Sequence, residues 1–285
     1  MSRVPSAADQ SLIDELAARG ITVTARQLER WRGAGIIETT RWSGQGRGGS
    51  QSAYPDGTAD QVIELVELLD ETRSLDVALL TLFGRGRSIQ HEGLVAAYTR
   101  SYEGLSQYGS EAGGDSWDRA EAVTRKRKFT SHPVVRAWRK NIRDRPNRDE
   151  SVHFETRITG ASVLHVLQTG EPTEDEDAAL IAQASGIQEI SESEELTIGF
   201  ADTLAELSFP ALAEVVESST LDDLVQARDS LRRISGFLSQ VSDVFPEPDD
   251  LLIALVAPAL IQIMRLTGPW WEELLADRNI ENTER

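Results

Sequence analysis

Two arginines one helical turn apart are the residues whose type and spacing best fit a defined chemistry. Arg26 and Arg30 lie in residues 24–32, and the apolar Leu28 and Trp31 mark the opposite helical face of that segment. Arginine presents a bidentate fork that the O6 and N7 atoms of guanine accept in the major groove of DNA, which accommodates one helix. The spacing therefore predicts that this face reads base edges; a merely solvated helix face is the alternative interpretation.

The residues around these arginines predict a well-defined start for the helix. Thr24 and Gln27 fit a capping box, and Val23 with Leu28 occupies the positions of a hydrophobic staple. We include Thr24 and Gln27 among the expected DNA contacts, since a glutamine amide also pairs with adenine. Arg32, at the end of the segment, is expected to reach a phosphate.

A glycine-rich segment follows this helix and predicts a long hairpin or loop. Residues 38–53 are rich in Gly, Ser, Gln, Thr and Arg, and residues 54–57, with the sequence Tyr-Pro-Asp-Gly, end the segment. Glycine permits close approach to a nucleic-acid backbone, and arginine favours narrow, negative grooves. The side chains expected to contact the DNA backbone or minor groove are Arg41, Trp42, Gln45 and Arg47.

The order of elements expected over residues 10–105 is that of a winged helix-turn-helix. Apolar periodicity predicts helices over residues 11–19 and 24–32, and further helices over 59–72, 74–83 and 88–106 after the hairpin. Residues 1–9 are expected to be disordered. The alternative for this domain is a winged helix that is structural or binds another protein.

The same residues resemble the start of the DNA-binding domain of the MerR family. The family's hydroxyl residue, arginine, leucine, aromatic position, glycine and two aliphatic residues correspond to Thr24, Arg26, Leu28, Trp31, Gly35, Ile36 and Ile37. Tyr54 resembles the tyrosine that ends the family's wing. The resemblance covers about a quarter of the chain and implies a dimeric regulator on a near-palindromic operator, with Arg26 and Trp31 contacting DNA. Tyr54 is also among the expected DNA contacts. Arg30 and Arg32 replace an aromatic and an acidic residue of the family, and the wing is longer.

Charge divides the chain into two parts. The net charge is −18, of which residues 1–150 carry +1 and residues 151–285 carry −19. The predicted fold is mainly α: a winged helix-turn-helix with a small β-wing over 10–105, a basic connector over 106–150, and an acidic all-helical domain over 151–285. That last domain is expected to serve dimerisation, effector sensing or partner binding. Within the connector, residues 119–148 are strongly basic. This segment fits a solvated surface, a phosphate-binding segment or a segment docked on the acidic half.

Two features of the acidic half have two interpretations each. Trp270 and Trp271 fit core packing or a dimer interface, and the alternative is an aromatic wall of a pocket for a small-molecule effector. Apolar residues from Leu224 to Phe245 are spaced mostly by threes and fours, which fits a dimer contact or an intramolecular core. A homodimer is expected because one short recognition helix buries too little surface for tight specific binding.

No catalytic, metal or cofactor site is predicted. The chain has no cysteine, its four histidines lack metal-ligand spacing, and neither a nucleophile elbow nor a phosphate-binding loop occurs. We therefore expect no enzyme. The N-terminus does not fit a signal peptide, and the longest apolar run, residues 251–261, is too short to span a bilayer, so a cytoplasmic protein without membrane contact is expected.

The sequence thus predicts a sequence-specific, double-stranded-DNA-binding transcriptional regulator that acts as a homodimer. The alternative is a protein-interaction factor, in which the acidic helical domain binds a partner and the winged helix is a docking module. Operator sequence, effector and sign of regulation are not predicted.

Overall fold

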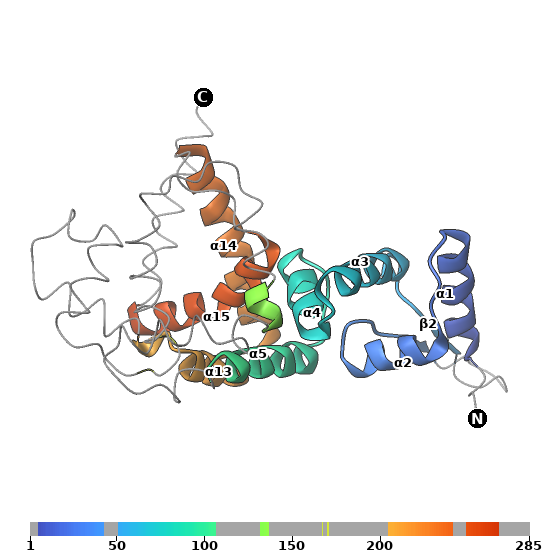
Figure 1. Ribbon diagram of the computed structural model, residues 1–285, viewed down its shortest axis with the longest axis horizontal. Helices are drawn as coiled ribbons and strands as arrows, with labels where there is room; N and C mark the ends of the chain where they lie inside the picture. Colours follow the sequence, from blue (N-terminus) through green and yellow to red (C-terminus); the bar gives the residue numbers. More distant parts are fainter. Residues whose placement is uncertain are drawn as a thin grey trace, which may run out of the picture. The chain divides into compact units, whose positions relative to one another are not determined.

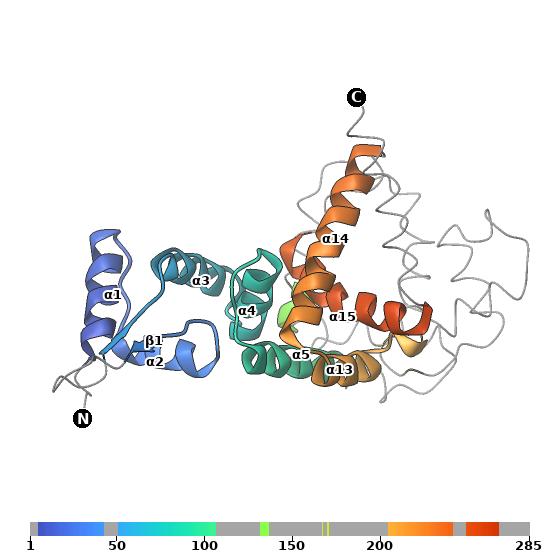
Figure 2. The same cartoon turned by 180° about the vertical axis from the view of Figure 1, so that it is seen from behind.

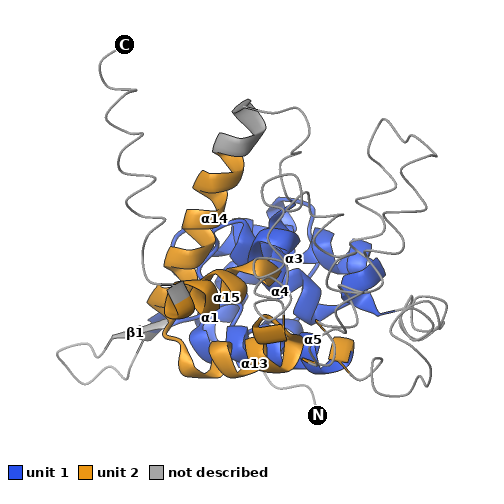
Figure 3. Cartoon of the chain, turned by 90° about the vertical axis from the view of Figure 1, so that its left-hand side faces the viewer, with its two compact units in different colours: residues 1–104, 126–148, 248–254 blue, residues 105–125, 149–247, 255–285 orange. Residues whose placement is uncertain are grey.

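The computed structural model describes residues 5–42, 51–106, 132–136, 167, 170, 205–241 and 249–267. The described residues are mainly helical, as the sequence predicted. The chain divides into two compact units: residues 1–104, 126–148 and 248–254 form the first, and residues 105–125, 149–247 and 255–285 the second (Figure 3). The first unit therefore contains the expected N-terminal domain, most of the basic segment, and one helical turn from near the C-terminus.

Helix α1 (Ala7–Ala18) opens the first unit and lies with α2 and a two-stranded sheet at one end of it (Figure 1). The Oγ of Ser6 caps α1 by accepting a hydrogen bond from the backbone N–H of Asp9 at 3.1 Å. Because serine at this position is a strong start signal, the helix begins earlier than the predicted Ser11. The expectation of disorder up to residue 9 is therefore wrong for residues 7–9. Leu12 and Leu16 are buried.

Helix α2 (Ala25–Gly33) begins with the predicted capping box, and both of its reciprocal hydrogen bonds are present. The backbone N–H of Thr24 donates to Oε1 of Gln27 at 2.8 Å, and the backbone N–H of Gln27 donates to Oγ1 of Thr24 at 3.3 Å. Each satisfies a backbone donor that the helix start leaves without a partner. After the helix, Gly35 has φ +72°, a conformation that glycine adopts without steric cost.

A short antiparallel sheet follows α2, built from β1 (Thr40–Trp42) and β2 (Gln51–Ala53). Thr40 lies opposite Ala53 and Trp42 opposite Gln51. Figure 2 shows β1 close to α2. The connection between the strands, residues 43–50, lies outside the described residues. The described ends agree with the paired strands that a hairpin over 38–53 predicts.

Three helices complete the N-terminal part of the first unit. They are α3 (Thr58–Thr72), α4 (Leu75–Gly84), which Ser74 caps as predicted, and α5 (His91–Ser106). Phe83, Tyr98 and Tyr102 are each at most 1% exposed. Tyr98 stacks on Tyr102 with ring centroids 5.8 Å apart and meets the edge of Phe83 at 6.5 Å. These rings are therefore part of the core between α4 and α5.

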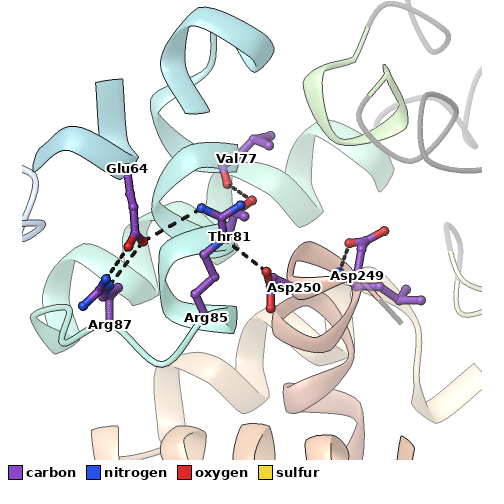
Figure 4. A network of polar contacts seen from close by, with 8 residues as sticks. Glu64, Val77, Thr81, Arg85, Arg87, Asp249 and Asp250 are labelled. Atoms are coloured by element: carbon purple, nitrogen blue, oxygen red, sulfur yellow. Dashed lines mark hydrogen bonds and ion pairs between the residues drawn. The ribbon is translucent and has the colours of Figure 1, made fainter. Parts of the chain in front are cut away.

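The first turn of α15 (Asp250–Thr267) belongs to this unit although it lies far along the chain. Asp249 caps it, accepting from the backbone N–H of Leu252 at 2.8 Å. Nε of Arg85 donates to Asp250 at 3.1 Å, and Figure 4 shows this contact beside the pair of Arg87 with Glu64.

Tyr98 supplies a hydrogen bond that α15 cannot make for itself. The carbonyl of Ala254 would normally accept from the N–H of residue 258, but Pro258 has no N–H. The buried hydroxyl of Tyr98 donates to that carbonyl at 2.7 Å. The proline inside the helix is therefore compensated by a side chain of α5.

The described part of the second unit contains α13 (Phe209–Ser218), α14 (Leu221–Val241) and the remainder of α15. Thr220 and Asp223 form a second capping box at the start of α14, with hydrogen bonds of 2.8 and 3.2 Å. Arg265 donates to the hydroxyls of Ser218 and Ser219 at 3.0 and 3.1 Å. Within the predicted seam, Leu224 is buried, and residues after Val241 lie outside the described part.

Candidate nucleic-acid interface

The two faces of α2 differ sharply in composition. Leu28 and Trp31 are 0% and 2% exposed, so one face of the helix is anchored in the core. Arg26, Glu29 and Arg30 are exposed on the rest of the helix. The helix thus presents two guanidinium groups to solvent from a short element held by its cap and its core contacts.

Most described arginines of the first unit already have an acidic partner. The pairs are Arg19 with Asp60 at 2.5 Å, Arg85 with Asp250 at 3.1 Å, Arg100 with Asp76 at 2.6 Å, Arg87 with Glu64, and Arg32 with Asp9. Among the described residues, Arg26 and Arg30 have neither an ion pair nor a side-chain hydrogen bond, and Arg73 likewise has none. The guanidinium groups of Arg26 and Arg30 are therefore available for an external anion or base edge.

The cap restricts what Thr24 and Gln27 can offer to DNA. Oε1 of Gln27 accepts from both the backbone N–H and the hydroxyl of Thr24, each at 2.8 Å. A glutamine that pairs with adenine needs this same oxygen as an acceptor and its amide nitrogen as a donor. In this conformation Gln27 can present only its amide nitrogen, so the bidentate adenine contact we expected would require the cap to open.

Trp31 does not reach the surface. Its side chain is 2% exposed and packs in the core together with Leu28. The expectation that Trp31 contacts DNA, which came from the family resemblance, is therefore wrong for this conformation. Helical spacing explains the result, since Trp31 shares the face of Leu28 three positions earlier.

A buried carboxylate joins α1, α2 and the end of β2. Asp9 on α1 has a side chain only 8% exposed. Tyr54, directly after β2, donates its hydroxyl to Oδ1 of Asp9 at 2.6 Å, and Nη1 of Arg32 on α2 bonds to both of these groups. The guanidinium carbon of Arg32 also lies 5.9 Å from the centre of the Tyr54 ring. We call these residues the Asp9 cluster.

Ionisation in the Asp9 cluster follows from its contacts. Burial alone raises the pKa of Asp9, but the hydrogen bonds from Arg32, Tyr54 and Ser6 outweigh it, and the pKa is lowered from the ordinary 3.8. Burial and the hydrogen bond to Asp9 raise the pKa of the Tyr54 phenol. At neutral pH the cluster therefore holds a carboxylate, a guanidinium and a neutral phenol.

The remaining expected contacts lie outside what the structure describes. Arg41 and Trp42 are in β1, but their side chains are not described, and Gln45 and Arg47 fall within residues 43–50. Trp270 and Trp271, expected in a core or an effector pocket, also lie outside the described residues. Of the basic segment, residues 132–136 are described: Val134 and Val135 are buried, and Arg136 donates to the carbonyl of Thr72 at 3.4 Å.

A polar cavity of about 230 Å³ lies beside the turn after α2. Glu38, Asp56 and the side chain of Gln61 line it, and Gln61 bridges the carbonyls of Ile36 and Ser88 at 2.7 and 2.9 Å. Gln61 therefore ties the turn after α2 to the segment between α4 and α5. In the described ranges, no three histidine or acidic side chains gather as a metal site would need. None of the described helices is long and apolar enough to cross a membrane.

Sequence reasoning missed Asp9, although a signal was present. Leu12 and Leu16 define the buried stripe of α1, and Asp9 lies on that stripe one turn before Leu12. An acid on an apolar stripe predicts a buried partner, and Arg32 stands where the resembled family carries an acid.

Comparison of the chain with protein-family models, curated proteins and solved structures found no match.

Proposed function

We propose that this protein is a sequence-specific DNA-binding transcriptional regulator that places α2 in the major groove. The observation that carries the proposal is the exposed pair Arg26 and Arg30. Both lie on a capped helix whose other face is buried, and neither has a partner among the described residues. A helix fixed in this way presents its guanidinium forks without the entropic cost of ordering the element on binding.

The charge of the surrounding surface supports the assignment of α2 over the neighbouring helices. Helices α3 and α4 contain no lysine or arginine, and the single arginine of α5, Arg100, is paired with Asp76. Of the described arginines without a partner, only Arg73, at the C-cap of α3, lies outside α2. The excess negative charge of the chain lies after residue 150, away in sequence from α2. A net charge of −18 is therefore compatible with a local cationic face, since the distribution decides where DNA binds.

We propose further that the protein binds as a homodimer to a near-symmetric operator. A single helix of the length of α2 reaches only three or four base pairs, and two copies about one DNA turn apart would give the surface that specific binding needs. On this proposal the acidic C-terminal half provides dimerisation, effector or partner contacts.

The test begins with selection of DNA from a random duplex library by the full-length protein. Affinity for the selected duplex and for a scrambled duplex is then measured by fluorescence anisotropy for wild type, Arg26→Ala and Arg30→Ala. Each variant should lose roughly 5- to 150-fold for the selected duplex, the range for a bidentate base contact, and much less for the scrambled one.

Arg100→Ala is the matched control. It removes one exposed guanidinium from the same unit, but Arg100 lies on α5 and is paired with Asp76. It should leave the ratio of the two affinities unchanged. Full sequence preference in both α2 variants would refute the role of α2, and a wild type that enriches no duplex at modest salt would favour the protein-interaction alternative.

A further inference from the structure

We propose that Asp9 and Tyr54 orient Arg32 as a preset contact for a DNA phosphate beside the recognition helix. This inference rests on the proposed function and deepens it. It assigns Asp9 and Tyr54 as positioning residues, and it gives Arg32 a part distinct from that of Arg26 and Arg30.

Contacts with described residues fix one of the three guanidinium nitrogens of Arg32 and leave the other two available as donors. Nη1 is held by Asp9 and Tyr54, while Nε and Nη2 make no hydrogen bond with the described residues. The Arg32 side chain is 28% exposed, so its guanidinium group is partly accessible to solvent although Asp9 and Tyr54 hold it. Because the guanidinium is planar, fixing Nη1 at two acceptors also sets the direction of the remaining donors.

The position of the cluster suits a backbone contact. Arg32 is on the helix that carries Arg26 and Arg30, and its partner Tyr54 directly follows β2. In helix-turn-helix proteins the elements beside the recognition helix contact the DNA backbone, so a donor at the end of α2 and next to β2 is placed near a phosphate. Phosphate oxygens accept arginine donors, and such contacts fix the register of the protein on the duplex.

Charge separates this contact from ordinary electrostatic attraction. The Asp9 carboxylate cancels most of the charge of Arg32 at long range, so the pair adds little to sequence-independent binding, which depends on net charge. What the pair supplies is direction at short range. Loss of orientation should therefore weaken binding to the selected duplex while leaving binding to a scrambled duplex unchanged or stronger.

The decisive comparison is between two substitutions on α1 that remove the same charge. Asp9→Asn disturbs the cluster, whereas Asp14→Asn changes an exposed residue whose side chain bonds only to Gln10, at 2.8 Å. Asp14→Asn should shift affinity for both duplexes by the same factor. Asp9→Asn should lower the ratio of specific to non-specific affinity by about tenfold or more, the effect of one charge-assisted hydrogen bond.

A second variant and a mapping experiment guard against a purely structural effect. Tyr54→Phe keeps the net charge and the ring, but it removes the hydroxyl that donates to Asp9 and accepts from Arg32. It should lower the ratio by roughly two- to tenfold. A loss of folded protein would reduce binding to both duplexes equally and leave the ratio unchanged. In phosphate-ethylation interference, one phosphate per half-site should cease to matter in Arg32→Ala and still matter in Arg26→Ala.

The outcomes distinguish this inference from the proposed function. If wild type fails to discriminate between the duplexes, the proposed function fails and this inference with it. If wild type discriminates, but Asp9→Asn and Tyr54→Phe keep its ratio, or ethylation interference in Arg32→Ala equals that of wild type, only the positioning role is overturned.

Discussion

The hydrogen bond from Tyr98 to the carbonyl of Ala254 makes a prediction that can be tested as a double-mutant cycle. Tyr98→Phe removes only the hydroxyl and leaves the ring in the core. When residue 258 is the native proline, the carbonyl of Ala254 in Tyr98→Phe has no donor, because Pro258 has no N–H. In a Pro258→Ala background the alanine N–H can take over. The cost of Tyr98→Phe should therefore depend on residue 258.

The magnitude follows from the burial of both partners. Tyr98 and Ala254 are each 0% exposed, so no water replaces the lost donor. A buried carbonyl left without a partner costs about 1–3 kcal/mol, and a middle value of about 2 kcal/mol changes the unfolding equilibrium by roughly 30-fold. With alanine at 258 the cost should fall below about 1 kcal/mol, which gives a coupling energy of about 1 kcal/mol or more.

Urea unfolding of the full-length protein, followed by circular dichroism, measures the cycle through the four transition midpoints. Pro258→Ala alone should stabilise the chain, since proline in a helix interior costs about 3 kcal/mol. Phe83→Leu in both backgrounds is a control for loss of core packing near Tyr98, and its cost should be the same in each. An equal cost of Tyr98→Phe with proline and with alanine at 258 would refute the compensation.

Three further changes have defined expectations. Gly84→Ala should destabilise the chain by about 1–3 kcal/mol in urea unfolding, because the new Cβ would lie 1.8 Å from a backbone carbonyl oxygen. Thr24→Ala should cost about 1 kcal/mol in the same assay through loss of the α2 cap. Asp9→Asn should make the free energy of unfolding fall less steeply as the pH is lowered. The pKa of Asp9 lies below the ordinary 3.8, so the stability that its carboxylate contributes is present above about pH 4 and is lost as the pH falls through the folded pKa.

Each of these changes has its own control. Gly33→Ala adds a Cβ that meets nothing within 4 Å, and should be neutral or stabilising. Thr22→Ala alters an exposed threonine outside the helix and should change little. For Asp9, a urea midpoint that falls between pH 5 and 2 as steeply in Asp9→Asn as in wild type would contradict the assignment, as would equal costs of the two glycine or the two threonine substitutions.

Local signals in the sequence predicted the elements of the first unit well. The capping pair Thr24 and Gln27, the cap Ser74 and the apolar periodicity of α3 act within a few residues, so one stretch of sequence contains them. The start of α1 was missed because the prediction followed the apolar stripe that begins at Leu12, and the cap at Ser6 lies six residues earlier. The predictions that the structure confirms are thus those in which a backbone group and its partner lie within a few residues of each other in the sequence.

Long-range contacts could not be predicted in the same way. The cluster of Asp9, Arg32 and Tyr54 joins residues 22 to 45 positions apart. Tyr98 reaches Ala254 across 156 positions. Nothing in the local pattern of α5 predicts that one of its tyrosines would replace a hydrogen bond lost to a distant proline. Such contacts depend on tertiary packing, which no local pattern contains.

The central claim is that Arg26 reads a base edge from α2, and removal of a single acceptor atom from the DNA tests it most directly. Each guanine of the selected duplex is replaced in turn by 7-deazaguanine, which lacks the N7 acceptor. Wild type should lose about tenfold or more in affinity at one guanine per half-site, the effect of one hydrogen bond to a charged group, and Arg26→Ala should lose nothing there. If wild type and Arg26→Ala respond alike at every guanine, α2 does not read DNA through Arg26.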